Sequence, residues 1–429
     1  MKTAAALPLA LLLAACGGGD DDEPGGPDGG GDDPSIPEPG TPILDRESPG
    51  THACEVLDAP AEVAGSTLGA AIAVVDGAPL VARTSYGPLG DDEFGHILGV
   101  TPASFSPMGL GEEAYRKTQL ATLRLPALAA SGDGAVLAWA EGDYQEDQSI
   151  FLARLDAAGD VIGAPQSITA GGTVVTVAAT AGQVAWVDDA LHVQPLDDGA
   201  PDGDASLVRT ARMNGAALAP AGDGLALVWT EVEGDPGVHL ALLDASGAVT
   251  AGPLRVSGAL PELTFVDAPA VIAAGDELLV AWSEHFWDED TDGHPETFDP
   301  RGHSIIRVAR VSGDGERVLA FEGVQAVEDD IIHLHPAFAA QEGGAVALSW
   351  SRGTFIPVCG GCISDNTRLM IVLEPHDLVP LSGPIEMEGP SGFSSATMTA
   401  VGDDLVHLLG LDYHAISTTA LARTRCAAN

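Results

Sequence analysis

The chain has 429 residues, with 63 acidic and 18 basic side chains, so its formal net charge at pH 7 is −45. This imbalance excludes a nucleic-acid binder that works by neutralising phosphates, because such a protein needs a basic face. Apolar residues make up 45% of the chain, which is enough to bury a core. The 53 glycines and 30 prolines indicate many turns rather than long helices.

The chain begins with MKTAAALPLALLLAAC, which has the features of a signal peptide. One basic residue precedes an apolar run of about a dozen residues, which is too short to span a bilayer as a mature helix. The end of this run, Leu13-Ala14-Ala15-Cys16, resembles the lipobox of bacterial lipoproteins. The resemblance implies a signal peptide over residues 1–15, cleavage before Cys16 and a lipid on its sulfur. An ordinary secretory signal with a chance cysteine is the alternative.

Residues 16–50 are expected to form the lipidated cysteine and a disordered tether. Residues 17–50 contain ten Gly, seven Pro and ten acidic side chains, with almost nothing apolar. Such a segment cannot bury enough surface to offset the entropy lost on ordering. By resemblance to lipoprotein sorting rules, the absence of Asp directly after Cys16 favours the outer membrane. We therefore expect a cell-envelope protein, periplasmic or surface-exposed, that contacts the membrane only through its lipid anchor.

Residues 51–429 repeat one pattern: a short apolar strand, a Gly/Asp turn and a second apolar strand that often ends in Trp and an acid. Clear copies are PALAASGDGAVLAWAE (126–141) and GAALAPAGDGLALVWTE (215–231). A second hairpin follows most copies, as in SIFLARLDAAGDVIGAPQSI (149–168), so each unit has four antiparallel strands, A to D. The seven Trp-equivalent positions are Arg83, Trp139, Trp186, Trp229, Trp282, Trp350 and Leu409.

Four-stranded units of this kind cannot cover both of their faces alone, so copies stack radially. The fold class is therefore expected to be all-β, a seven-bladed β-propeller, with six or eight blades as alternatives. Residues 51–429 resemble bacterial β-propeller lipoproteins with degenerate, Trp-centred blades, and we expect a monomer. Sialidases are the nearest enzyme comparison. Their characteristic turn reads Ser-x-Asp-x-Gly-x-x-Trp. In the turn at residues 131–134 of this chain the Gly comes one place earlier than in that motif, and Trp139 comes one place later, which counts against a sialidase.

The seventh copy supplies three strands before the chain ends, so its outer strand is expected from residues 53–59. This pairing would bring Cys54 next to Cys426. With Cys16 lipidated, four cysteines remain, an even number in an oxidising compartment. We therefore predict two disulfides, Cys54–Cys426 across the ring closure and Cys359–Cys362 within a loop.

Long insertions over residues 84–118, 284–304 and 352–367 are expected on one face, where binding sites usually lie. The second contains DEDTDGHPE (288–296), which resembles calcium loops of EF-hands and integrin-type propellers. Hard Ca²⁺ needs several oxygens that converge, and this spacing places carboxylates at loop positions 1, 3, 5, 9 and 12. A solvated acidic loop and another metal are the alternatives. The predicted calcium ligands are Asp288, Asp290, Asp292, Glu296 and Asp299.

Two further groups of polar residues are candidates on the same face. His285, His294 and His303 with His333-x-His335 could hold a transition metal if alternate strand positions share one side, with packing or surface histidines as the alternative. Four of the B strands end in an acidic residue. These four acids either form a negative ring at the central channel or cap loop N–H groups. These acids are Glu141, Asp188, Glu231 and Glu284, while Arg83 and Arg352 replace the pattern and could bind carboxylates.

No catalytic set can be assigned from spacing alone, so catalytic residues stay unknown and no cofactor beyond Ca²⁺ is expected. The tether and the decayed repeats favour a non-enzymatic lipoprotein whose propeller presents a loop-rich face to a protein or glycan partner. The alternative is a secreted propeller glycoside hydrolase or polysaccharide lyase with carboxylates from different blades. Two or more carboxylates that converge with a His or Arg at the channel mouth would favour the enzyme.

Overall fold

The structure is a computed structural model. It describes residues 37, 40–64, 67–88, 94–105, 108–119, 123–142, 148–169, 172–260, 264–287, 302–328, 331–356, 362–388, 393–413 and 416–429. The signal peptide, Cys16, Cys359 and all five predicted calcium ligands lie outside these residues. No helix in the described part is long and apolar enough to cross a membrane.

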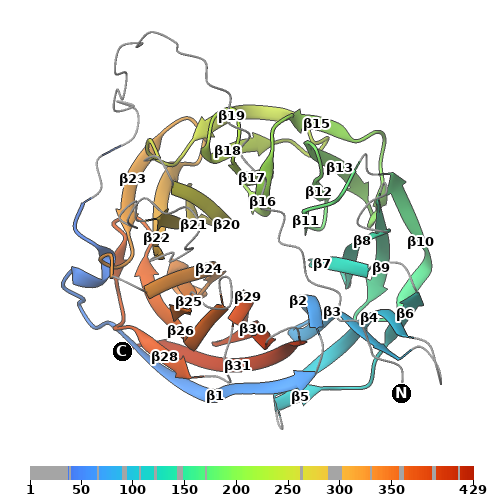
Figure 1. Cartoon of the computed structure of the whole chain (residues 1–429), viewed down its shortest axis with the longest axis horizontal. Coiled ribbons are helices and arrows are strands. Elements are labelled where there is room, and N and C mark those ends of the chain that lie inside the picture. Colours follow the sequence, from blue (N-terminus) through green and yellow to red (C-terminus); the bar gives the residue numbers. More distant parts are fainter. Residues whose placement is uncertain are drawn as a thin grey trace, which may run out of the picture. The chain divides into compact units, whose positions relative to one another are not determined.

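Seven antiparallel sheets, called blades 1 to 7 here, form a ring, which confirms the seven-bladed β-propeller (Figure 1). Blade 1 comprises β2 (Thr67–Val75), β3 (Ala78–Pro88), β4 (Phe94–Phe105), β5 (Met108–Leu110) and β6 (Tyr115–Gln119). Blade 2 comprises β7 (Leu123–Ser131), β8 (Gly134–Glu141), β9 (Ser149–Asp156) and β10 (Val161–Thr169). Blade 3 comprises β11 (Thr176–Ala179), β12 (Gln183–Val187), β13 (Leu191–Asp197), β14 (Ala200–Pro201) and β15 (Ser206–Arg209).

The remaining blades follow the same order from the centre of the ring outward. Blade 4 comprises β16 (Met213–Ala221), β17 (Gly224–Glu231), β18 (Gly237–Leu243) and β19 (Val249–Arg255). Blade 5 comprises β20 (Thr264–Ala274), β21 (Glu277–Trp287), β22 (Gly302–Ser312) and β23 (Val318–Gly323). Blade 6 comprises β24 (Ile331–Ala340), the 3₁₀ turn η2 (Glu342–Gly344), β25 (Val346–Ile356), β26 (Cys362–Glu374), β27 (Val379–Pro380) and β28 (Ile385–Glu388). Blade 7 comprises β29 (Phe393–Val401), β30 (Asp404–Tyr413), β31 (Ile416–Ala428) and β1 (His52–Ala64).

Apolar side chains between neighbouring blades form the core. Five tryptophans lie in the second strand of their blades and are at most 2% exposed. Trp139, for example, packs with Leu80 and Leu98 of blade 1 and stacks on Phe151 of its own blade, with ring centroids 5.5 Å apart. Each tryptophan therefore buries a large apolar surface where two sheets meet.

The ring closes through strands from opposite ends of the chain. β1 pairs antiparallel with β31, and Cys54 faces Cys426 in the register. A disulfide joins these two cysteines, which are 372 residues apart in the sequence, and their Cα atoms are 4.1 Å apart. This is the pair that we expect from the missing outer strand of blade 7, although the strand is longer than residues 53–59.

The packed body begins earlier than residue 51, the boundary that composition predicts. Within the 3₁₀ turn η1 (Ile43–Asp45), Ile43 is completely buried against the core of blades 5 and 6. The N–H of Leu44 donates to the carbonyl of Val324 at 2.9 Å, and Arg46 pairs with Glu322 at 2.8 Å. Ile43, the adjacent Leu44 and one ion pair thus hold the end of a segment that is otherwise nearly free of apolar residues.

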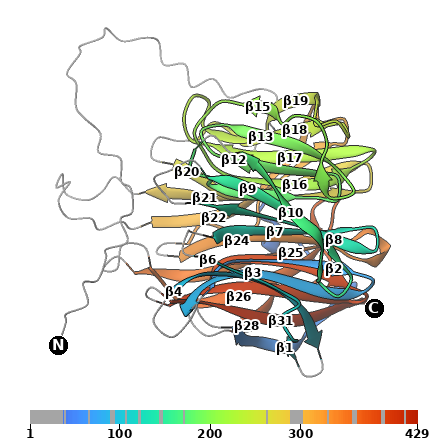
Figure 2. The ribbon, with the colours of Figure 1, turned by 90° about the vertical axis from the view of Figure 1, so that its right-hand side faces the viewer.

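The insertions at 84–118 and 352–367 are largely strand in the described residues. In blade 1 the register continues outward to Pro88 opposite Phe94, and in blade 6 to Ile356 opposite Cys362. Figure 2 shows that the tips of β21 and β22 and the start of β4 reach the same side of the ring. The B–C connections therefore extend their blades as β-ribbons on one face.

Candidate functional site

Two of the strand-end acids join neighbouring blades through ion pairs. Glu231 of blade 4 accepts two hydrogen bonds from Arg209 of blade 3, at 3.0 and 2.8 Å, and its side chain is fully buried. Burial raises the pKa of Glu231, but the bonds from Arg209 and from the Asp235 N–H outweigh it, so the pKa lies below its ordinary value. Glu141 of blade 2 pairs in the same way with Lys117 of blade 1.

The other two strand-end acids are bound within their own blades. Glu284 accepts a hydrogen bond from Arg307 at 2.7 Å. Asp188 accepts one from the N–H of Ala190 at 2.9 Å and lies 3.2 Å from the imidazole of His192. All four acids therefore have partners in the fold, which favours the structural alternative over a ring of free negative charge.

The two arginines that replace the repeat pattern also have acidic partners within the chain. Arg352 pairs with Glu328 at 2.9 Å, and Arg83 lies 3.8 Å from Glu113. Both charges therefore have a neighbouring carboxylate. The pair of Arg352 is exposed, and exposed ion pairs contribute little to stability, whereas the pair of Arg83 is half-buried.

The innermost strands supply mostly small apolar side chains. β2, β16 and β20 lie around the centre of the ring (Figure 1), and their sequences are TLGAAIAVV, MNGAALAPA and TFVDAPAVIAA.

In the part of the chain that the structure describes, no three His, Cys, Asp or Glu side chains are placed to hold a metal ion.

His333 and His285 of blades 5 and 6 are buried in the fold. His333 is 1% exposed, and its Nδ1 accepts a hydrogen bond from the indole of Trp350 at 3.1 Å. His335 has φ +52° where the register of β24 shifts, so the strand alternation that would place both imidazoles on one side is interrupted. Burial lowers the pKa of His333 and of His285 to about 3, because an enclosed imidazole loses the hydration of its charged form. His294 and the His303 side chain lie outside the described residues.

An exposed aromatic cluster, named the aromatic shelf here, consists of Tyr86, Phe94 and His96 on the extended β3–β4 ribbon. Tyr86 is 48% exposed and Phe94 is 58% exposed. The ring centroid of Tyr86 lies 6.2 Å from that of Phe94 and 5.3 Å from that of His96. Sequence reasoning missed this cluster, because only the register that places Tyr86 opposite His96 brings it together.

The shelf continues a buried face of blade 1. Thr84 and Leu98 pair directly inward of Tyr86 and His96 and are completely buried. Side chains alternate along a strand, so these four lie on one face. Because Leu98 packs against blade 2, the shelf is the part of this face that extends past its neighbour. Exposed aromatic side chains on such an extension are typical of binding surfaces.

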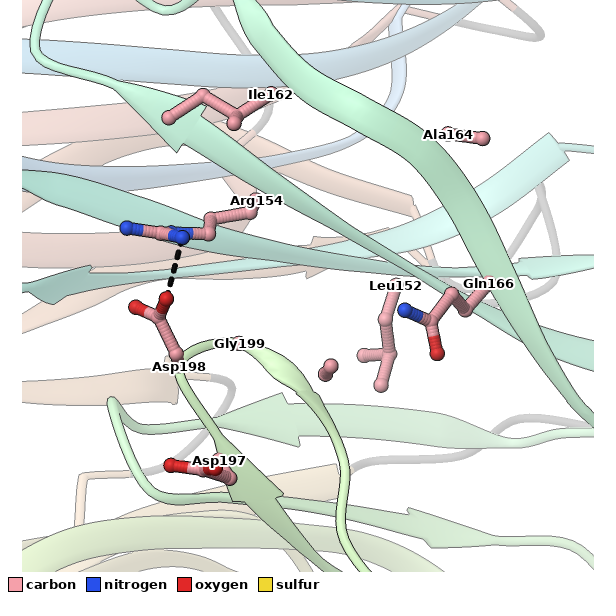
Figure 3. A pocket seen from close by; sticks show the side chains of 9 residues that line it. Leu152, Arg154, Ile162, Ala164, Gln166, Asp197, Asp198 and Gly199 are labelled. Carbon is pink, nitrogen blue, oxygen red and sulfur yellow. Dashed lines mark ion pairs between the residues drawn. The ribbon is translucent and has the colours of Figure 1, made fainter.

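A groove of about 300 Å³ lies between the outer strands of blades 2 and 3 (Figure 3). Leu152, Ile162 and Gln166 of blade 2 form one side, and the turn between β13 and β14 forms the other. Since β14 has only two residues, it leaves this part of blade 2 uncovered. Arg154 pairs with Asp198 across the groove, so these two charges are already compensated.

No protein-family model matches the chain, and no curated protein matches it. Among solved structures it is similar to a protein of unknown function from Dyadobacter fermentans, with 9% identity, a TM-score of 0.51 and coverage of 88% of this chain and 100% of that one. It is also similar to an α-L-arabinofuranosidase from Fusarium graminearum, with 9% identity, a TM-score of 0.50 and coverage of 86% and 97%. Likeness at this level of identity shows the fold alone.

Proposed function

We propose that the protein is a non-enzymatic cell-envelope lipoprotein whose propeller binds a protein or glycan partner on the face that carries the extended B–C ribbons. The aromatic shelf supports this proposal most directly. Tyr86 and Phe94 expose large, rigid rings at the tip of a paired ribbon, and such rings contact a partner at a low cost in side-chain entropy. The lipobox resemblance at Cys16 and the tether support attachment to the outer membrane.

The strand-end acids favour binding over the hydrolase or lyase alternative. An enzyme of that class needs carboxylates free to exchange protons or attack a sugar. Here Glu231 and Glu284 are held by arginines, and the body's excess of negative charge disfavours an anionic polysaccharide as substrate. A neutral glycan or a protein surface is the partner that this charge permits.

Removal of the shelf is expected to remove partner binding while leaving the fold intact. All proteins carry Cys16→Ser, so that the lipid contributes nothing, and retention by isolated cell envelopes is measured. Tyr86→Ala with Phe94→Ala should lower the affinity by roughly a hundredfold, because exposed aromatic anchors each contribute about 1–2 kcal/mol. The matched control is Leu207→Ala, which removes a 60% exposed apolar side chain from blade 3.

Equal retention of the double variant and the parent protein would show that the shelf is not the binding surface. Protease treatment of the envelopes before binding separates the two partner classes. Retention that survives the treatment indicates a glycan, and retention that is lost indicates a protein.

Calcium binding at Asp288, Asp290, Asp292, Glu296 and Asp299 is a second proposal, which the loop spacing supports. We expect Ca²⁺ to raise the melting temperature of the parent protein, because a ligand that binds only the folded state stabilises it. Asp288→Ala with Asp290→Ala should abolish this rise in differential scanning calorimetry. A rise of unchanged size in the double variant would rule the site out.

A further inference from the structure

One blade boundary contains charged and polar groups at repeat positions that are apolar in other blades. In blades 2 to 5 the residue paired with the position after Trp is apolar and completely buried. These residues are Ile150, Leu191, Val238 and Ile306. In blade 6 the corresponding residue, opposite Ser351, is Arg368, which is also completely buried. An arginine thus occupies a core position of the repeat.

The guanidinium of Arg368 is bound only by neutral oxygens in the described part of the chain. Nη1 donates to the carbonyl of His335 at 2.8 Å and to Oγ of Ser351 at 3.1 Å. Nη2 donates to the carbonyl and to Oγ of Ser349, at 3.1 and 2.9 Å. No described carboxylate pairs with Arg368, and its Nε–H has no acceptor among the described residues.

This arrangement leaves a buried positive charge to be explained. Burial lowers the pKa of Arg368 to about 9, so the side chain is still mostly protonated at neutral pH. A buried charge is costly unless an opposite charge compensates it. A buried donor without a partner likewise points to an ion or water at the site.

Blade 7, on the other side of this boundary, contains a second exception to the repeat pattern. His407 lies two residues before Leu409, at a position that Leu137, Val184, Leu227, Val280 and Leu348 occupy in blades 2 to 6. It is completely buried, and its Nε2 lies 3.0 Å from Oγ1 of Thr424. Its Nδ1 has no partner among the described residues.

The two exceptions meet at the boundary between blades 6 and 7. Oγ1 of Thr424 reaches Sδ of Met370 in blade 6 at 3.5 Å, and Met370 is two positions from Arg368 on the same side of β26. The charge of Arg368 also contributes to the low pKa of His407, in addition to burial. Arg368 and His407 therefore lie at the same blade boundary, one on each side of it.

We propose that Arg368 and His407 form a binding site for a small monovalent anion, with chloride as its simplest occupant, between blades 6 and 7. The Nε–H of Arg368 donates to the anion, and its guanidinium supplies the compensating charge. The neutral imidazole of His407 adds a second donor through its Nδ1–H, in the tautomer whose Nε2 accepts a hydrogen bond from the hydroxyl of Thr424. This site is independent of the aromatic shelf and its partner.

Melting temperatures at pH 7.5 and constant ionic strength, with chloride replacing gluconate, test the proposal on the full chain. Chloride should raise the melting temperature of the parent protein saturably, by about 2–4 °C. Arg368→Met should lose this saturable rise, whereas Arg212→Met, which removes a 58% exposed arginine, should keep it. If Arg368→Met does not fold, His407→Leu provides the second variant and should weaken chloride binding at least tenfold.

Bromide gives a direct readout in crystals of the parent protein. An anomalous peak between Arg368 and His407 would support the site, and bromide peaks confined to the surface would overturn it. The absence of any saturable chloride effect in the parent protein, or an unchanged effect in both variants, would also overturn it.

Discussion

Replacement of Cys54 and Cys426 by serine is expected to lower the free energy of unfolding by roughly 5–6 kcal/mol, on the chain-entropy estimate for a loop of this length. The disulfide closes a loop of 372 residues, so it removes much of the freedom of the unfolded chain. It also holds β1, the outer strand of blade 7, which comes from the other end of the chain. Urea unfolding of the oxidised protein and of the double variant measures the difference.

The pair Cys359→Ser and Cys362→Ser is the matched control, whether or not these residues form the predicted disulfide. Two cysteines three positions apart close a very short loop, so their removal should change the unfolding midpoint little. Dithiothreitol should lower the midpoint of the parent protein to that of Cys54→Ser with Cys426→Ser. Identical midpoints for the oxidised parent and this variant would show that the clasp does not stabilise the ring.

Acidification from pH 7 to pH 5 is expected to destabilise the propeller strongly, because four histidines enclosed by the fold must stay neutral in the folded state. Burial lowers the pKa of His285, His333 and His407 to about 3 and that of His335 to about 4. In the unfolded chain these groups titrate near 6.5, so below that pH the unfolded state binds more protons. Their contribution is therefore complete above pH 6.5 and is lost progressively as the pH falls toward 3. At pH 5 the loss is of the order of 2 kcal/mol per histidine.

Urea midpoints at pH 7, 6 and 5, with chloride held constant, measure this dependence. His407→Leu should flatten it by about one proton, because the variant has one group fewer to protect from protonation. His376→Ala, which removes a 69% exposed histidine, should leave it unchanged. The lowered pKa of Glu231 also makes the folded state less stable on acidification, but only at a more acidic pH than the histidines do. Equal stability at pH 7 and pH 5 would contradict the prediction.

The fold could be predicted because its signals are local and repeated. Alternating apolar residues on both sides of a Gly/Asp turn specify a hairpin, and seven copies of the unit specify a ring. The closure of blade 7 also followed from counting strands, since the last copy lacked one. By contrast, the boundary at residue 51 was too late. Composition averages over a whole segment, and only Ile43 and Leu44 of this one pack against blades 5 and 6.

The candidate sites were less predictable, because their partners lie on other blades. The acid at the end of a B strand is visible in the sequence, but Lys117 is a neighbour of Glu141 only after two blades stack. The alternation expected for His333 and His335 is interrupted by a register shift. The aromatic shelf depends on cross-strand pairing beyond the repeat, which no local pattern marks.

The sequence by itself determined the blade unit and predicted the cysteine pair at the closure, and it favoured seven blades over six or eight, since each depends on strand periodicity and on counting. The tertiary structure decided which charges are compensated and which aromatic rings stay exposed. The physical reason is that compensation and exposure depend on distances of a few ångströms between strands of different blades. Arg368 illustrates this: in the sequence it is one arginine among many, and in the ring it is a completely buried charge that helps to lower the pKa of His407.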